Sequence, residues 1–146
     1  MRRVIAILED DPRRTEAMRE VLKQIGSEYD HRFFDNAPET IAWLEEHMDE
    51  VALLSLDHDL GGNRSRKGEI FDPGTGRDVA EYLAAQSRVC PTMIHSNNYP
   101  AVLGMCRVLE DGGWKFSCVV PYGDVEWIRE TWAREVGKIM RPKNRP

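Results

Sequence analysis

The chain has 146 residues, with 20 basic and 25 acidic side chains and a net charge of -5. This length fits one domain with its own core, and the charge speaks against a general nucleic-acid or bilayer-binding surface. The N-terminus lacks the apolar core of a signal peptide, and no apolar stretch approaches the length of a membrane span. The three cysteines, Cys90, Cys106 and Cys118, lie far apart in the sequence. We therefore expect a reduced cytoplasmic protein.

The first part of the chain alternates short apolar runs with segments of helical period. Residues 4–8 are typical of a buried strand, and Asp11 before Pro12 is typical of a helix N-cap with proline at the first helical position. A weaker strand at residues 31–35 and a helix opened by Asn36 follow. The pattern predicts strands joined by crossover helices.

The next apolar run, residues 51–56, ends directly at Asp57, His58 and Asp59. A buried strand therefore delivers two carboxylates and an imidazole to one point. Carboxylates that are crowded at the end of a strand repel each other and lose hydration, a cost that a cation or basic groups relieve. This segment is the first candidate for a functional site.

A polar, basic and glycine-rich stretch follows at residues 61–74. It is longer than a normal strand-to-helix turn and too irregular for a regular element, so we expect an inserted loop. Thr75 and Gly76 then start a predicted helix, and residues 91–94 form a fourth strand that runs into the polar residues 95–98.

The last part of the chain repeats this alternation. Pro100 opens a helix, residues 116–120 form a fifth strand, and an apolar stripe over 125–139 predicts a final helix. The tail 141–146 is rich in proline and basic residues and is expected to fray, which leaves a single domain over residues 1–140.

Five strands alternating with five helices indicate an α/β fold, a doubly wound five-stranded parallel sheet of order 2-1-3-4-5 between two helical layers. In this order, a crevice lies at the carboxyl ends of the first and third strands. Glu9 and Asp10 close the first strand, Asp57 closes the third, and His95 with Ser96 closes the fourth. We therefore expect three separate segments to converge on one site.

Several of these features resemble the receiver domain of bacterial response regulators: the motif at residues 7–14, the aspartate after the third strand, the hydroxyl residue after the fourth and the proline after the fifth. The resemblance spans nearly the whole chain. It implies that Glu9 and Asp10 help to bind magnesium, that Asp57 is the phosphoacceptor and a metal ligand, and that Ser96 is the switch hydroxyl.

The chain also departs from the receiver pattern. Receivers carry a lysine just before the proline that follows the fifth strand, and this chain has Val120 there. The turn after the phosphoacceptor is replaced by residues 60–62 and the basic loop. Residues 56–61, 75–79 and 95–98 together resemble the divergent receiver family inferred to process cyclic phosphates, which implies a phosphoesterase-like activity.

The acids point to a divalent ion, Mg2+ or Mn2+, because hard cations prefer oxygen ligands. The expected ligands are the carboxylates of Glu9, Asp10 and Asp57, to which the receiver resemblance adds the backbone carbonyl of Asp59. A bound ion would polarise a phosphoryl oxygen and lower the pKa of a water ligand.

Candidates for proton transfer and for substrate binding lie close to these acids in the predicted fold. His58 and His95 are candidates for proton transfer, since histidine titrates nearest neutral pH, and they join Asp57 and Ser96 in the expected catalytic set. Basic and amide side chains can neutralise phosphate and orient a substrate. The candidates for binding the substrate are Arg64, Arg66, Lys67, Arg77, Asn97 and Asn98.

Each candidate also has a purely structural interpretation. Asp11 is assigned to the helix cap and not to the metal. Glu9 and Asp10 can form a solvated cluster at a helix start, although Asp57 on the neighbouring strand favours the metal site. Either candidate histidine can have a structural role, His58 by bonding a backbone group, and the basic loop can be a solvated surface.

Three functions remain open. The preferred one is a metal-dependent phosphoesterase that acts on a small, cyclic phosphate ester. The second is a stand-alone response-regulator receiver that accepts phosphate on Asp57 from a phosphodonor protein in a two-component phosphorelay, or that binds a partner protein without catalysis. The third is a degenerate receiver whose acids bind metal without turnover. Neither a nucleic acid nor a membrane is expected as a partner.

Overall fold

The computed structural model describes residues 2–141, and its centre is a five-stranded parallel sheet. The strands of this sheet are β1 (Val4–Leu8), β2 (Asp30–Phe34), β3 (Val51–Leu56), β6 (Thr92–His95) and β7 (Phe116–Val119). Their order is β2-β1-β3-β6-β7. This is the predicted order, with the numbering shifted because a separate hairpin contributes β4 and β5. The doubly wound α/β class is confirmed.

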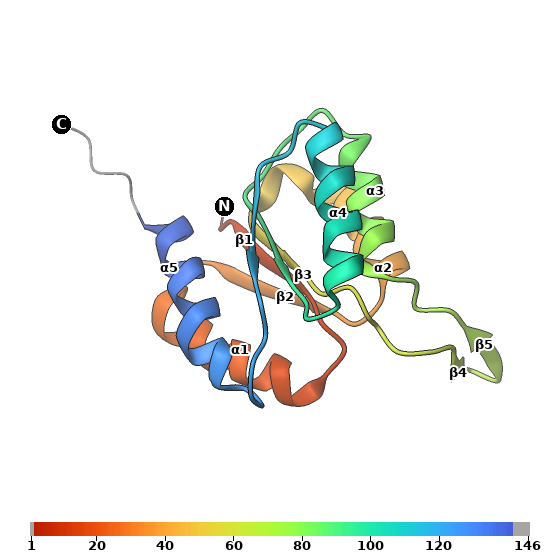
Figure 1. The fold of residues 1–146 in the computed structure, drawn as a ribbon, viewed down its shortest axis with the longest axis horizontal. Helices are drawn as coiled ribbons and strands as arrows, with labels where there is room; N and C mark the ends of the chain where they lie inside the picture. The colour runs from red at the N-terminus through yellow and green to blue at the C-terminus, as the bar shows by residue number, and fades with distance from the viewer. Residues whose placement is uncertain (1, 142–146) are drawn as a thin grey trace.

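Helices cover both faces of the sheet (Figure 1). One face carries α1 (Pro12–Ile25), the π-helical turn η2 (Ile128–Trp132) and α5 (Ala133–Met140). The other face carries α2 (Ala37–His47), the 3-10 turn η1 (Met48–Glu50), α3 (Gly76–Ala84) and α4 (Tyr99–Asp111). None of the helices within residues 2–141 is long and apolar enough to cross a bilayer.

The central strands are buried on both sides, and this fixes where their ends lie. On β1, Ile5 and Ile7 pack into the core beneath α1 and α5, while Ala6 and Leu8 pack into the core beneath α2, α3 and α4. Successive side chains of a strand point to opposite faces, so a continuous apolar run suits a strand that is covered twice. The polar residues that follow these strands are therefore held at one edge of a rigid sheet.

The inserted stretch is not the irregular loop that we predicted. It contains a two-stranded antiparallel hairpin of β4 (Arg64–Arg66) and β5 (Glu69–Phe71), which stands away from the body of the molecule (Figure 1). Lys67 and Gly68 both have positive φ angles, 53° and 79°. Two such residues form the tight turn that matches the twist of a hairpin. The strands are too short and too polar to show the usual alternation of apolar side chains.

The helix caps follow the sequence closely. Asp11 caps α1 by accepting a hydrogen bond from the Arg13 amide, and Asn36 caps α2 in the same way through the Glu39 amide. The final predicted helix is present and contains the π-helical turn η2, which runs directly into α5. Most of the predicted frayed tail, residues 142–146, lies outside the described residues.

Candidate metal centre

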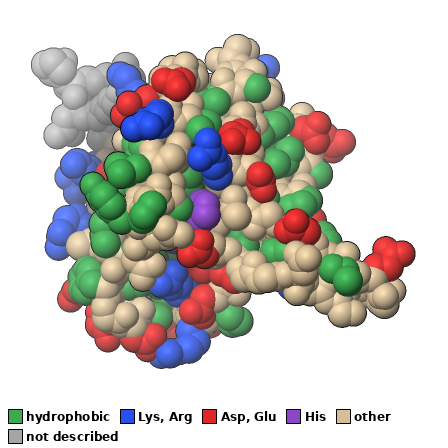
Figure 2. Space-filling view, turned by 45° about the vertical axis from the view of Figure 1, so that its right-hand side comes forward, with side chains coloured by type: hydrophobic (Ala, Val, Ile, Leu, Met, Phe, Trp, Pro, Cys, Tyr) green, Lys and Arg blue, Asp and Glu red, His purple; other side chains and the backbone are tan. Residues whose placement is uncertain are grey.

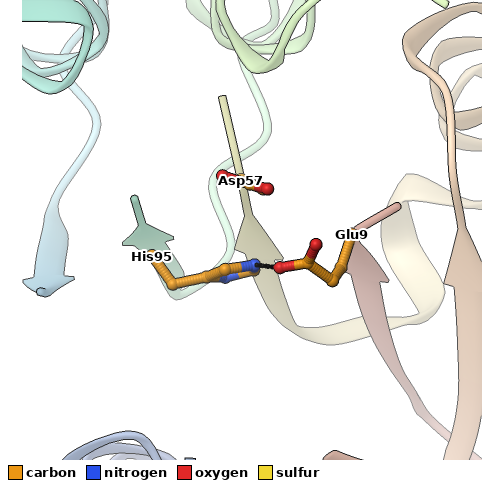
Figure 3. A group of neighbouring side chains, drawn as sticks. All are labelled: Glu9, Asp57 and His95. Atoms are coloured by element: carbon orange, nitrogen blue, oxygen red, sulfur yellow. Dashed lines mark ion pairs between the residues drawn. The ribbon is translucent and has the colours of Figure 1, made fainter. Parts of the chain in front are cut away.

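Three buried side chains from three strands converge at the carboxyl edge of the sheet. Glu9 follows β1, Asp57 follows β3, and His95 is the last residue of β6 (Figure 3). Each offers one ligand atom, and these atoms all lie within 4.8 Å of one another. The exposed fractions of the residues are 2% for Glu9, 5% for Asp57 and 0% for His95. We call this group the acid–histidine cluster.

One nitrogen of the His95 ring is held from behind by a buried hydrogen-bond chain. His95 Nδ1 lies 2.7 Å from Ser55 Oγ, and Trp132 Nε1 donates to the same oxygen at 3.1 Å. The ring also stacks on Trp127, with 5.9 Å between centroids. A histidine that binds a metal is commonly oriented through its other ring nitrogen in this manner.

The second ring nitrogen faces the acids. His95 Nε2 lies 3.2 Å from Glu9 Oε1, as the dashed line in Figure 3 marks. The direction is poor for a hydrogen bond, and Nε2 is a buried nitrogen without a well-formed partner among the described residues. An unsatisfied buried polar atom is costly, and a metal ion bound to this nitrogen would remove that cost.

The donor set fits a divalent cation. Two atoms that bind the same ion lie no more than about 4 to 5 Å apart, twice a typical metal–ligand distance, and the ligand atoms of the acid–histidine cluster all lie within 4.8 Å of one another. Two carboxylates and an imidazole suit Mn2+ better than Mg2+, which prefers oxygen alone. His95, a candidate for proton transfer in the sequence, also offers a ligand atom in this group.

In the absence of a cation, burial and the neighbouring charges give the carboxyl groups of Asp57 and Glu9 very different pKa values. Burial raises the pKa of Asp57 to about 8, and the nearby charge of Glu9 adds to this effect. Burial also acts to raise the pKa of Glu9, but the close contact with His95 and its charge, the Asp11 amide and Arg14 outweigh it and lower that pKa to about 2. Two close carboxyl groups out of water cannot both ionise easily. A divalent cation would remove this conflict.

Asp10 lies beside the acid–histidine cluster without joining it. Its carboxylate approaches the backbone of Gly61, and it borders a surface cavity of about 400 Å³ that Glu9 and Arg66 also line. Burial and the charge of Glu9 raise the pKa of Asp10. It therefore lies at the rim of this cavity, next to Glu9.

A second polar group forms the outer side of the site. His58 Nδ1 lies 2.6 Å from Asp59 Oδ1, and Asn98 Nδ2 donates to the same oxygen at 3.1 Å. Contact with His58 lowers the pKa of Asp59. Ser96 is buried and its hydroxyl accepts a hydrogen bond from the Asn98 amide, while Asn97 is exposed. The imidazole of His58 is thus oriented through Nδ1, with Nε2 left for another contact.

The four basic residues that we predicted to bind the substrate have different contacts in the structure. Arg64 donates to the backbone carbonyls of Asp35 and Leu60 and so ties the inserted segment to the body. Arg66 pairs with Glu39 at 3.1 Å, and Lys67 occupies the exposed hairpin turn. Arg77 pairs with a glutamate one turn further along α3. Figure 2 shows acidic and basic side chains interspersed over this face, with a histidine between them.

Sequence reasoning missed Arg14. Its guanidinium lies 3.4 Å from Glu9 Oε1, 3.9 Å from Asp57 Oδ2 and 5.2 Å from the centre of the Trp127 ring. In the sequence it is the last residue of the motif at residues 7–14, five positions after Glu9, and nothing there separates it from Arg13. Ser55 was also missed, although a serine inside the apolar run 51–56 was a visible anomaly.

Gly76 lets the next helix approach the site closely. A Cβ atom at this position would lie 1.9 Å from the backbone oxygen of Asp57, and the Gly76 amide donates to the carbonyl of His58 at 2.9 Å. The first residue of α3 therefore rests directly on the segment that carries Asp57. Glycine is required here because any side chain would displace that segment.

Solved structures with this fold are response-regulator receivers. The Mn2+-bound form of response regulator Rcp1 has a TM-score of 0.70 at 14% identity, covering 99% of each chain. A receiver domain from Rhodospirillum rubrum has a TM-score of 0.68 at 14% identity, covering 98% of this chain and 96% of its own. The phosphorylated cyanobacterial phytochrome response regulator RcpA has a TM-score of 0.66 at 14% identity, covering 95% and 91%. These identities show the fold alone.

The sequence itself assigns the chain within this fold. No curated protein matches it. The sequence profile of the cyclic-phosphate processing receiver domain matches residues 5–111. The match includes all members of the acid–histidine cluster, the outer group around His58 and the inserted hairpin. The chain belongs to the family of cyclic-phosphate processing receiver domains.

Proposed function

We propose that this chain is a divalent-metal-dependent phosphoesterase that acts on a small cyclic phosphate ester. The observation that carries the proposal is the unsatisfied Nε2 atom of His95, which faces the carboxylates of Glu9 and Asp57 in a buried site. An ordinary buried histidine finds hydrogen-bond partners at both ring nitrogens. This arrangement is what a metal site requires, and the family to which the chain belongs supplies the class of substrate.

The residues of the chain divide the work. Glu9, Asp57 and His95 hold the ion, and a bound divalent ion polarises a phosphoryl oxygen and acidifies a water ligand. With His95 engaged as a ligand, His58 is left as the residue that moves a proton, since Asp59 fixes its Nδ1 atom and its Nε2 atom stays available. The imidazole in the ligand set makes Mn2+ our preferred metal.

The cavity of about 400 Å³ beside Glu9 and Asp10 is our candidate for the organic part of the substrate. Its lining includes the aromatic ring of Phe33, and Arg19 packs over this ring at 4.1 Å. Arg66 reaches the same cavity from the hairpin. Most of the lining is charged, with the acids Glu9, Asp10, Asp35 and Glu39 beside the cations Arg19 and Arg66, while Pro12, Phe33 and Phe34 supply apolar contact.

A second candidate function is phosphate acceptance on Asp57 in a two-component phosphorelay, with a sensor kinase as the partner. The fold supports it, because a phosphorylated response regulator is among the similar structures. Two observations count against it. Asp57 is only 5% exposed, and the position where receivers carry a lysine is Val120, whose side chain is 67% exposed and carries no charge.

The test is incubation with Mn2+ or Mg2+ and either a panel of cyclic phosphates or acetyl phosphate, with removal of the metal by chelation before phosphorus NMR. We expect a cyclic ester to be opened or hydrolysed by the wild type and by Asp111→Asn, an exposed acidic control on α4. We expect no turnover with Asp57→Asn or His95→Gln. A stable acyl phosphate on Asp57 without ester turnover would replace this proposal by the receiver function.

A further inference from the structure

We propose that Arg14 binds the phosphate group of the substrate at the metal centre. This inference rests on the proposed function and gives a role to the last residue of the motif at residues 7–14, for which the sequence alone indicates none. Within residues 2–141, Arg14 is the only basic residue in ion-pair distance of both Glu9 and Asp57. Its guanidinium reaches the site from α1.

The contacts of Arg14 are too long to consume its hydrogen-bonding capacity. It makes one hydrogen bond to Glu9 at 3.4 Å and lies 3.9 Å from Asp57 Oδ2. A guanidinium carries five N–H donors in a planar fork that matches phosphate oxygens. Most of these donors therefore stay available in the described structure. The side chain is 21% exposed, so an anion in the site can reach it.

The aromatic ring of Trp127 holds Arg14 in this place. The guanidinium lies 5.2 Å from the ring centre, within the range of a cation–π contact. Trp127 is fully buried and stacks on His95 in turn. The position of the cation is thus set by the same aromatic residue that supports the metal-binding imidazole.

The charges give Arg14 a different role before and after metal binding. Without a metal, it offsets the negative charge of Glu9 and Asp57. A divalent ion bound by these two carboxylates would neutralise their charge, so Arg14 would no longer be needed to offset it. The positive charge that then remains beside the ion belongs to Arg14, and it is directed toward an anionic ligand of the metal.

Two titrations test this inference, using Mn2+ alone and then inorganic phosphate as the probe. Electron paramagnetic resonance measures Mn2+ affinity, and paramagnetic broadening of the phosphate phosphorus signal measures phosphate binding to the Mn2+-loaded protein. The variants are Arg14→Gln and Arg14→Lys. The matched control is Arg13→Gln, which removes a neighbouring arginine whose side chain is 70% exposed and pairs with Asp124.

We expect Arg14→Gln to bind Mn2+ at least as tightly as the wild type, because a repelling positive charge is gone. Its phosphate affinity should fall by about tenfold to a hundredfold, the range for a lost charge-assisted contact. Arg14→Lys should recover part of this loss, and Arg13→Gln should behave like the wild type. If Arg14 merely supported the fold of the site, Mn2+ affinity and phosphate affinity would fall together, which would overturn the inference.

The failure of this inference is distinct from the failure of the proposed function. Mn2+ and phosphate binding to the wild type, with unchanged phosphate affinity in Arg14→Gln, would overturn the role of Arg14 alone. Mn2+ binding without phosphate binding would do the same. Absence of Mn2+ binding to the wild type would overturn the metal centre and, with it, the role of Arg14.

Discussion

The acid–histidine cluster and the β4-β5 hairpin are both polar, but they are built in opposite ways. The cluster lies at the ends of three central strands, and each member is at most 5% exposed. The hairpin projects into solvent, and its cation Arg66 pairs with a glutamate at 44% and 52% side-chain exposure. Water screens charges on the hairpin and is excluded from the cluster. We therefore expect the cluster to carry metal binding and catalysis, and the hairpin to affect only substrate binding.

The largest effect should come from adding a methyl group beneath the cluster. In Gly76→Ala, the new Cβ atom would lie 1.9 Å from the carbonyl oxygen of Asp57, and backbone must move to accept it. We expect a loss of about 4 kcal/mol or more in the free energy of unfolding, measured by chemical denaturation. The control is Gly62→Ala, where a Cβ atom would meet nothing within 4 Å. Equal stability of the two variants would contradict the close approach of α3.

The pH dependence of the free energy of unfolding should reveal the cost of ionising Asp57 beside Glu9 in the buried cluster. Folding raises the pKa of Asp57 from 3.8 to about 8. Between these values the metal-free folded protein binds more protons than the unfolded chain, so the free energy of unfolding falls as the pH rises. We expect Asp57→Asn to flatten this decline and to stabilise the metal-free protein at pH 8 by about 2 to 4 kcal/mol.

The contribution of Glu9 has the opposite sign and lies in another pH range. Folding lowers the pKa of Glu9 from 4.5 to about 2, so its stabilisation is present above 4.5 and is lost as the pH falls toward 2. It therefore does not cancel the decline due to Asp57 above pH 5. Thermal melting at several pH values measures both the loss of stability at low pH due to Glu9 and the decline at higher pH due to Asp57. Asp111→Asn is the exposed control. A metal-free stability that stays constant from pH 5 to pH 8 would refute the raised pKa of Asp57.

A smaller effect, on metal affinity, is expected from removing the hydroxyl group that orients the His95 imidazole. Ser55→Ala removes the hydroxyl that holds His95 Nδ1 while leaving every proposed metal ligand in place. Loss of such an orienting contact typically weakens metal binding by about tenfold to a hundredfold. Isothermal titration with Mn2+ measures the change. Ser117→Ala is the matched control, because the buried Ser117 hydroxyl has no hydrogen-bond partner among the described residues.

The smallest effect is expected on the hairpin. Arg66→Ala removes an exposed ion pair with Glu39 and a contact with the Phe71 ring. Exposed pairs contribute less than about 1 kcal/mol, so the free energy of unfolding should change little. Mn2+ affinity should stay at the wild-type value, and only the Michaelis constant for a substrate that enters the cavity should rise. A large loss of Mn2+ affinity would show that the hairpin and the cluster are not separate regions.

The sequence was sufficient for the sheet and for the convergence of its polar ends. Continuous apolar runs such as residues 51–56 predict doubly covered strands, and the alternation of strands with helices indicates the doubly wound order. The carboxyl ends of neighbouring parallel strands meet at one edge, which brought Glu9, Asp57 and His95 together before any coordinates were known. The Asp11 cap was predictable for a similar reason, because its hydrogen bond is local.

The sequence was insufficient where side chains meet across the fold. The chain from Trp132 through Ser55 to His95 joins η2, β3 and β6, and no local pattern connects these positions. The place of Arg14 depends on how α1 packs against Trp127, which is 113 positions away in the sequence. The hairpin was missed because its two three-residue strands are mostly polar and stand in solvent, where no apolar alternation is required.

The central claim is that Glu9, Asp57 and His95 bind one divalent metal ion. Electron spin echo modulation of Mn2+ bound to the protein tests it most directly, because a coordinated imidazole gives a nitrogen signal from the histidine. We expect one tightly bound Mn2+ with this signal in the wild type, and loss of the signal in His95→Gln. A bound Mn2+ without the nitrogen signal in the wild type, or with the signal retained in His95→Gln, would contradict the assignment.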